Sequence, residues 1–222
     1  MNKDKIIDHI KNCFENAENN MSKISDDIKN LDGMSGLYTR HFYNNLLNIE
    51  DARYLEIGSW KGSSVCSAMY QNNATVVCID DYSEAHGGDI GDTFPVKTFT
   101  QNFQKFKGNN NALFINKNCY EVDLNSLPKF NIYMYDGNHS YENHYKALEY
   151  FYDVLDDIFI FIVDDWNNNT IRDATYKSIQ DLKLNVLYEK EVRNTWDGSH
   201  APQPLAKNTW WNGIYIVLLE KK

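Results

Sequence analysis

The chain has 222 residues, 42% hydrophobic and 24% charged, which suffices for one globular domain with a full core and is marginal for two. Its formal net charge of -9 repels phosphate backbones, so nucleic acid is an unfavourable partner, and no apolar run approaches the ~20 residues that span a membrane. The polar N-terminus carries no signal-peptide pattern and the four cysteines form no Cys-x-x-Cys pair, so we expect reduced thiols in a cytoplasmic protein.

The N-terminal part of the chain has the periodicity of helices. Residues 4–31 carry apolar side chains three and four positions apart, with the Asn19-Asn20 pair as a candidate break, and a second helical stretch starts at Leu37. We expect residues 1–50 to form a helical segment packed on a domain of residues 51–222, the two making a single globular unit. The apolar stripe could instead be a lid or the surface of a homodimer; simple packing is the default.

From residue 53 onward, short apolar runs alternate with helical stretches. Strands are expected at 53–57, 75–80, 112–115, 131–135, 158–163, 185–192 and 213–219. Helices are expected at 63–70, 99–106 and 171–182, and after the fourth strand, where Tyr141, Tyr145, Leu148, Tyr152 and Leu155 would form one buried stripe. The alternation predicts an α/β domain with a mainly parallel sheet, and the continuous apolar runs of the fourth and fifth strands suit strands covered on both faces.

Polar residues suited to chemistry follow the carboxyl ends of the strands, where an open parallel sheet binds its ligands. The first strand is followed by a turn from Gly58 to Gly62, through which a backbone can approach a ligand closely. Asp80 ends the second strand about 20 residues further on, where an acid can hold ribose hydroxyls. The Gly-x-x-x-Gly spacing differs from the Gly-x-Gly-x-x-Gly of dinucleotide enzymes, and such a turn can also be a plain connection. With Asp80, it favours a ribose-bearing cofactor.

The stretch Leu55-Glu-Ile-Gly-Ser-Trp-Lys-Gly-Ser63 resembles the first motif of class I methyltransferases, which use S-adenosylmethionine. The resemblance extends from Tyr54 through Trp166. It is strongest to small-molecule O-methyltransferases of the macrolide-sugar type and more distant to the catechol type. It implies a Rossmann-like, doubly wound, mainly parallel seven-stranded sheet with an antiparallel edge strand.

The resemblance also implies where the cofactor lies. Glu56, Gly58 and Gly62 would contact its methionine part and backbone, and Asp80 its ribose. The adenine would lie near Asn118 and Cys119, where many relatives carry an acid at the position of Asn118. We include further residues around the turn and the strand ends among the cofactor-binding positions: Ser59, Trp60, Ser63, Asp81 and Asp136.

A second group of polar residues follows the fourth and fifth strands, which are neighbours in this fold. Carboxylates from the two strand ends can meet around a hard cation, and Mg²⁺ prefers oxygen ligands. The resemblance implies that Asp136, Asp164 and Asp165 bind the metal and that His139, three residues after Asp136, is the general base. The alternative is that Asp136 belongs to a simple turn and that the Asp164-Asp165 pair is a solvated strand end and helix cap.

The leading hypothesis is an O-methyltransferase that acts on a small hydroxylated molecule with Mg²⁺, in which Asp136 and His139 are the catalytic residues. A bound metal lowers the pKa of a hydroxyl, and His139 could take its proton. Three alternatives remain open: a metal-independent or N-methyltransferase, a nicotinamide-dependent oxidoreductase, and a non-catalytic cofactor-binding protein.

The acceptor pocket is the least readable part of the sequence. We expect the segment 82–110 to shape it, with Trp60 and Trp166 as possible walls. The Trp-rich segment 193–212 could fold over the acceptor or be an ordinary connection between edge strands, which is the interpretation we prefer. The chemical identity of the acceptor does not follow from the fold.

Overall fold

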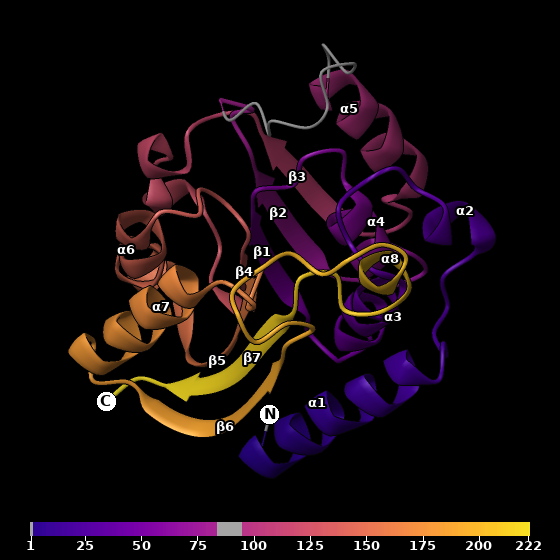
Figure 1. The fold of residues 1–222 in the computed structure, drawn as a ribbon. Helices are drawn as coiled ribbons and strands as arrows, with labels where there is room; N and C mark the ends of the chain where they lie inside the picture. The colour runs from indigo at the N-terminus through magenta and orange to yellow at the C-terminus, as the bar shows by residue number, and fades with distance from the viewer. Residues whose placement is uncertain (1, 84–94) are drawn as a thin grey trace.

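The computed structural model describes residues 2–83 and 95–222, which are built around a seven-stranded sheet (Figure 1). The strands are β1 (Arg53–Ile57), β2 (Thr75–Ile79), β3 (Asn111–Ile115), β4 (Phe130–Tyr135), β5 (Leu155–Asp164), β6 (Asn185–Val192) and β7 (Ile214–Glu220). Their order is β3-β2-β1-β4-β5-β7-β6. Strands β1 to β5 run parallel to one another, whereas β7 is antiparallel to both β5 and β6. This confirms the predicted Rossmann-like, mainly parallel sheet.

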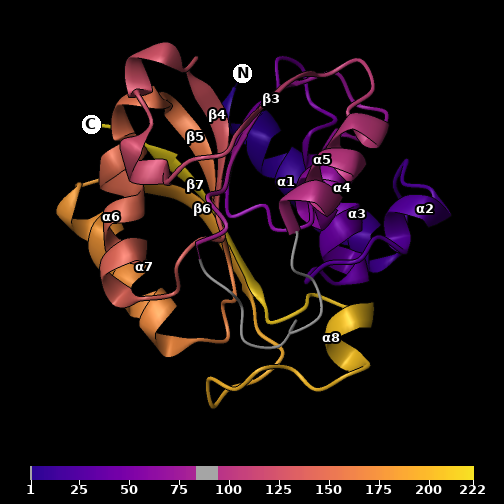
Figure 2. The same ribbon diagram turned by 90° about the horizontal axis from the view of Figure 1, so that it is seen from above.

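Helices cover both faces of the sheet (Figure 2). They are α1 (Lys3–Glu18), α2 (Asp26–Lys29), α3 (Leu37–Leu46), α4 (Ser63–Met69), α5 (Pro95–Phe106), α6 (Tyr141–Phe151), α7 (Asn169–Asp181) and α8 (Leu205–Asn208). Helices α6 and α7 lie on one face, and α1 to α5 lie on the other. Because successive side chains of a strand point to opposite faces, Tyr54 of β1 joins the core under α1 to α5 and Leu55 joins the core under α6 and α7.

The N-terminal helices pack against the sheet through aromatic side chains. Helix α1 stops at Glu18, and Asn20 has a left-handed backbone (φ 55°), as the predicted break requires. The ring of Phe14 on α1 lies 4.6 Å from that of Phe42 on α3 and 5.1 Å from that of Trp210, which precedes β7. The first and last parts of the chain therefore share one core.

Of the predicted buried stripe of α6, only Leu148 is a buried residue of the helix: Tyr145 and Tyr152 are half-buried, and Leu155 is the first residue of β5. Tyr141 is 42% exposed, and the buried residues of the helix are His144, Ala147, Leu148 and Phe151. This set has the three-and-four spacing of a helix face, but one member is a histidine rather than an apolar residue. Burial lowers the pKa of His144 to about 3, so the ring packs as a neutral group in a T-shaped contact with Tyr135.

Three of the four cysteines are buried free thiols, and Cys119 is half-buried. Within the described part of the chain, no helix is long and apolar enough to cross a membrane. Part of the segment 82–110, which we expected to shape the acceptor pocket, lies outside the described residues, namely 84–94. The rest includes α5, whose buried face of Phe99, Phe103 and Phe106 packs on the core.

Candidate functional site

The turn after β1 is held tightly against two neighbouring strand ends. Gly58 has a left-handed backbone (φ 85°), and a Cβ there would lie only 1.9 Å from the carbonyl oxygen of Asp136. Across the turn, the Trp60 amide donates to Oδ2 of Asp80, and the Tyr82 amide donates to Oδ1, each at 2.8 Å. Burial raises the pKa of Asp80 despite these bonds. The glycine is required for the close approach, and Asp80 locks the turn to the end of β2.

A pocket of about 240 Å³ opens where β1, β2 and β4 end. Seven of the predicted cofactor-binding residues line it: Gly58, Trp60, Asp80, Asp81, Asn118, Cys119 and Asp136. Residues that the sequence did not single out complete the wall, including Lys117, Tyr120, Asn138 and Asn143. The predicted ribose side (Asp80) and adenine side (Asn118) therefore border one cavity.

The other predicted cofactor-binding residues do not line this pocket. Glu56 is fully buried, where its carboxylate accepts hydrogen bonds from Tyr54 Oη (2.6 Å) and Ser64 Oγ (2.8 Å). Burial raises the pKa of Glu56 to about 7, and these hydrogen bonds oppose the shift. Ser63 Oγ accepts from Ser35 Oγ at 2.9 Å instead of facing the pocket. Ser59 is also buried, and Gly62 (φ 86°) caps α4.

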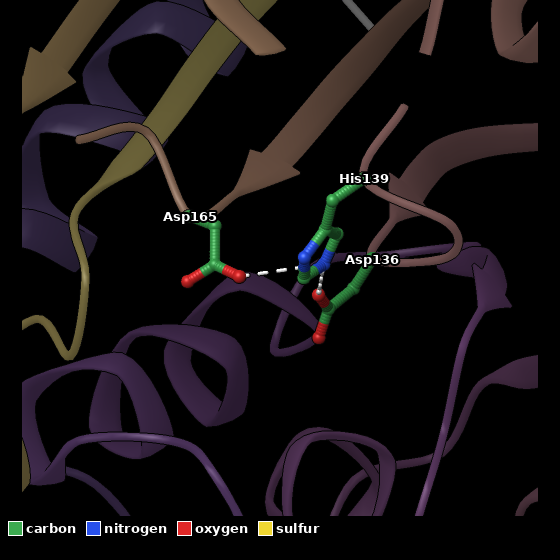
Figure 3. Close-up of side chains that lie close together, drawn as sticks. All are labelled: Asp136, His139 and Asp165. Atoms are coloured by element: carbon green, nitrogen blue, oxygen red, sulfur yellow. Dashed lines mark ion pairs between the residues drawn. The ribbon is translucent and has the colours of Figure 1, made fainter. Parts of the chain in front are cut away.

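Three side chains from two strand ends meet beside this pocket (Figure 3). Asp136 and His139 follow β4 and Asp165 follows β5, and ligand atoms of all three lie within 4.8 Å of one another. His139 Nε2 lies 3.3 Å from Asp165 Oδ2 and 3.7 Å from Asp136 Oδ1. The backbone of Asp165 is left-handed (φ 53°). Its side chain therefore departs from the pattern in which successive side chains of β5 point to opposite faces of the sheet.

Asp164 does not belong to this three-residue group. It is the last residue of β5, is 4% exposed, and has one carboxylate oxygen with no hydrogen-bond partner among the described residues. Burial, and then the nearby charges of Asp136 and Asp165, raise its pKa well above its ordinary value. The group thus contains His139 beside Asp136 and Asp165, and the metal-binding role of Asp164 stays a prediction.

A second pocket of about 620 Å³ adjoins the first and shares Gly58, Trp60, Asp80 and Asp136 with it. Its other lining residues are Asp32, Gly33, Met34, His139, Asp164, Asp165, His200, Trp211 and Asn212. Six of these come from outside the strand ends: residues 32–34 precede α3, and the other three lie between β6 and β7. No periodicity marks such loop positions: the sequence offered only the segment 193–212 as a possible cover of the acceptor, and it gave no sign of residues 32–34.

The tryptophans are distributed differently from the prediction. Trp60 lines both pockets, but Trp166 is fully buried, stacks on Tyr215 at 4.1 Å and donates from Nε1 to Glu191, so it is a core residue. Because Trp211 lines the second pocket, the segment 193–212 is more than an ordinary connection. It lies at one end of the sheet (Figure 2).

The sheet order and the pocket at the ends of β1, β2 and β4 are those of the Rossmann-like methyltransferase fold. Residues 55–166, half of the chain, match the family described as a methyltransferase domain. The chain belongs to this family and is an S-adenosylmethionine-dependent methyltransferase.

Solved structures share the fold across almost the whole chain. A Klebsiella pneumoniae protein provisionally described as an O-methyltransferase matches with a TM-score of 0.54 and 12% identity, over 96% of this chain and 90% of that one. An S-adenosylhomocysteine-bound methyltransferase from Podospora anserina matches with a TM-score of 0.55 and 14% identity, over 97% and 88%. Identities this low establish the fold alone. No curated protein matches the sequence.

Proposed function

We propose that the protein methylates a hydroxyl oxygen of a small molecule with the help of a divalent cation such as Mg²⁺. The observation that carries the proposal is the group of Asp136, His139 and Asp165, whose ligand atoms lie within 4.8 Å of one another. All three border the larger pocket, and Asp136 also borders the smaller one. The group therefore stands where a methyl donor in one pocket would meet an acceptor in the other.

The donor set fits a hard cation. Asp136 and Asp165 offer carboxylate oxygens, the ligands that Mg²⁺ prefers, while the imidazole of His139 is better suited to holding a proton. Such a cation lowers the pKa of a hydroxyl and orients its oxygen. The imidazole of His139 would accept the hydroxyl proton, and Asp165, whose Oδ2 lies 3.3 Å from Nε2, would stabilise the imidazolium that forms.

The remaining roles follow from the two pockets. Asp80 would hold the ribose while Gly58 and Trp60 approach the cofactor, which supplies the methyl group, and Asn118 and Cys119 would border its adenine. The acceptor would occupy the larger pocket. Its described lining contains five aspartates and no lysine or arginine, so a neutral or cationic acceptor is favoured over one that carries phosphate or carboxylate.

A metal-independent reaction is the second candidate. It is favoured by the 3.3 Å pair of His139 and Asp165, because a carboxylate beside an imidazole can orient a general base without a cation. The two candidates differ in their response to chelation.

The test is S-adenosylhomocysteine release with a panel of sugars and catechols, before and after EDTA treatment and again with added Mg²⁺. We expect EDTA to abolish turnover and Mg²⁺ to restore it. Asp136→Asn should raise the Mg²⁺ concentration needed for half-maximal rate, while Asp181→Asn, an exposed acid on α7 paired with Lys177, serves as the control. Full activity in EDTA would refute the metal role, and methylation of nitrogen, seen by mass spectrometry and NMR of the product, would refute O-methylation.

A further inference from the structure

Asn212 lies beside Asp165 because of the antiparallel strand β7. The pairing of β5 with β7 reaches Asp164 and Ile214 and continues beyond the strands, where the Asn167 amide donates to the Asn212 carbonyl at 2.8 Å. This places residue 212 opposite the residues that follow β5. Asn212 is buried, with 5% of the residue exposed.

The amide of Asn212 makes three contacts. Its Nδ2 donates to Asp165 Oδ1 at 2.8 Å and lies 2.6 Å from His200 Nδ1, while its Oδ1 accepts from the Ala201 amide at 2.9 Å. The Ala201 N–H can only donate, so the amide oxygen must face it and the NH₂ group must face Asp165 and His200. The orientation of the side chain is therefore fixed by its partners.

We propose that Asn212 is a positioning residue that aims the carboxylate of Asp165 at the metal site. This inference rests on the proposed function, since it assumes that Asp165 is a metal ligand. One oxygen of Asp165 is taken by Asn212, and the other lies 3.3 Å from His139 Nε2. Hydrogen bonds from outside a metal site orient its ligands, and their loss typically weakens metal binding. Asn212 gives Asp165 such a bond.

The same amide also sets the tautomer of His200, which lines the larger pocket. Because Asn212 Nδ2 donates, His200 Nδ1 accepts, and in the neutral ring the hydrogen is then on Nε2. One buried side chain thus joins the connection between β6 and β7 to a metal ligand and to a wall of the acceptor pocket. Neither Asn212 nor His200 was marked by the sequence.

The experiment compares the Mg²⁺ and Mn²⁺ affinities of cofactor-free wild-type protein, Asn212→Leu and Asn167→Ala by calorimetry and by Mn²⁺ spin resonance. Asn167 is the matched control: it is also buried, and its side chain binds the same connection at the Asn194 amide (2.9 Å) and the Ser199 carbonyl (3.2 Å). We expect Asn212→Leu to weaken metal binding by roughly 10- to 100-fold and Asn167→Ala to leave it near the wild-type value. Excess Mg²⁺ should restore much of the turnover of Asn212→Leu.

Two results would overturn the inference while leaving the proposed function intact: a metal affinity of Asn212→Leu within twofold of wild type, or an equal loss in Asn167→Ala. If wild-type protein itself binds neither cation, the metal-assisted function fails first and the inference fails with it.

A second measurement applies if Asn212→Leu does not fold. The side-chain amide resonance of Asn212 in wild-type protein must then shift during a Mg²⁺ titration, with the dissociation constant that calorimetry gives for Mg²⁺. An unchanged resonance would also overturn the inference.

Discussion

His139 Nε2 lies 3.3 Å from Asp165 Oδ2, although the two residues follow different strands. Strands β4 and β5 are parallel neighbours with Tyr135 opposite Val163, so the loops that follow them start side by side. The left-handed backbone of Asp165 then turns its carboxylate toward the β4 loop. An imidazole and a carboxylate thus meet on the wall of the larger pocket.

Replacing His139 by alanine should remove the general base. We expect kcat to fall by roughly 10²- to 10⁴-fold, the usual contribution of a positioned base, while the dissociation constant for S-adenosylmethionine changes little. His139 lines the larger pocket and is absent from the lining of the smaller one, which is why the two effects should separate. Added imidazole should recover part of the rate, whereas an unchanged kcat would exclude His139 as the base.

The sequence was sufficient to predict the elements that position the site, because strands and turns carry local signals. The run before Gly58 reads as a strand from its own residues, and Asp80 and Asp136 are visible as acids that end apolar runs. The prediction for Tyr141 failed because helix periodicity was followed through aromatic residues, while the buried face includes His144. A count that allowed a neutral histidine in the core would have found the correct face.

Residues from distant loops could not be predicted in this way. Asn212 reaches Asp165 only because β7 inserts between β5 and β6, and the strand order is a property of the whole sheet. Asp32, before α3, similarly enters the larger pocket through the packing of the N-terminal helices, where it pairs with Lys61 at 2.8 Å. Side chains brought together by tertiary structure leave no spacing pattern in the sequence.

Substitution of Asp80 by asparagine should weaken cofactor binding. The carboxylate borders the smaller pocket and accepts the amides of Trp60 and Tyr82, so the variant loses charge-assisted bonds and loosens the turn. Hydrogen bonds to charged groups contribute about 1.5–3 kcal/mol, which corresponds to roughly 10- to 100-fold in affinity. Calorimetry with S-adenosylhomocysteine would measure this loss. Asp123→Asn, at an exposed helix cap outside the lining of the pocket, should bind as wild type.

Glu56 should make the protein less stable as pH rises. Burial raises its pKa to about 7 from an ordinary value of 4.5, so between these values the folded state binds more protons than the unfolded state. The contribution of Glu56 to the unfolding free energy is therefore fully present below pH 4.5 and is lost as pH rises through about 7. At 1.36 kcal/mol per pKa unit, the loss amounts to about 3 kcal/mol. Glu56→Gln stays neutral and can still accept from Tyr54, so it should lack this loss.

The measurement is urea unfolding of wild-type protein and Glu56→Gln at pH 5 and pH 8. The effect of Glu56 is the difference between the two proteins in how their unfolding free energy changes with pH. The buried histidines His41 and His144 have pKa values lowered to about 4 and about 3, and their stabilising effect is lost as pH falls below 6.5. That opposite slope is common to both proteins and cancels in the comparison. Parallel pH dependences in wild type and Glu56→Gln would show that Glu56 does not titrate in this range.

Gly58 and Gly108 offer a matched pair for testing the close approach of β1 and β4. Both have left-handed backbones (φ 85° and 53°), so alanine should cost about 1–2 kcal/mol at either position through backbone strain alone. A Cβ at Gly108 meets nothing closer than 4.0 Å, but at Gly58 it would lie 1.9 Å from the carbonyl oxygen of Asp136. Forced overpacking adds about 1–3 kcal/mol, so Gly58→Ala should lose clearly more unfolding free energy in urea than Gly108→Ala.

Because the displaced backbone is that of Asp136, Gly58→Ala should also bind Mg²⁺ more weakly. Equal losses of stability in the two variants would mean that the loops after β1 and β4 are not packed as described.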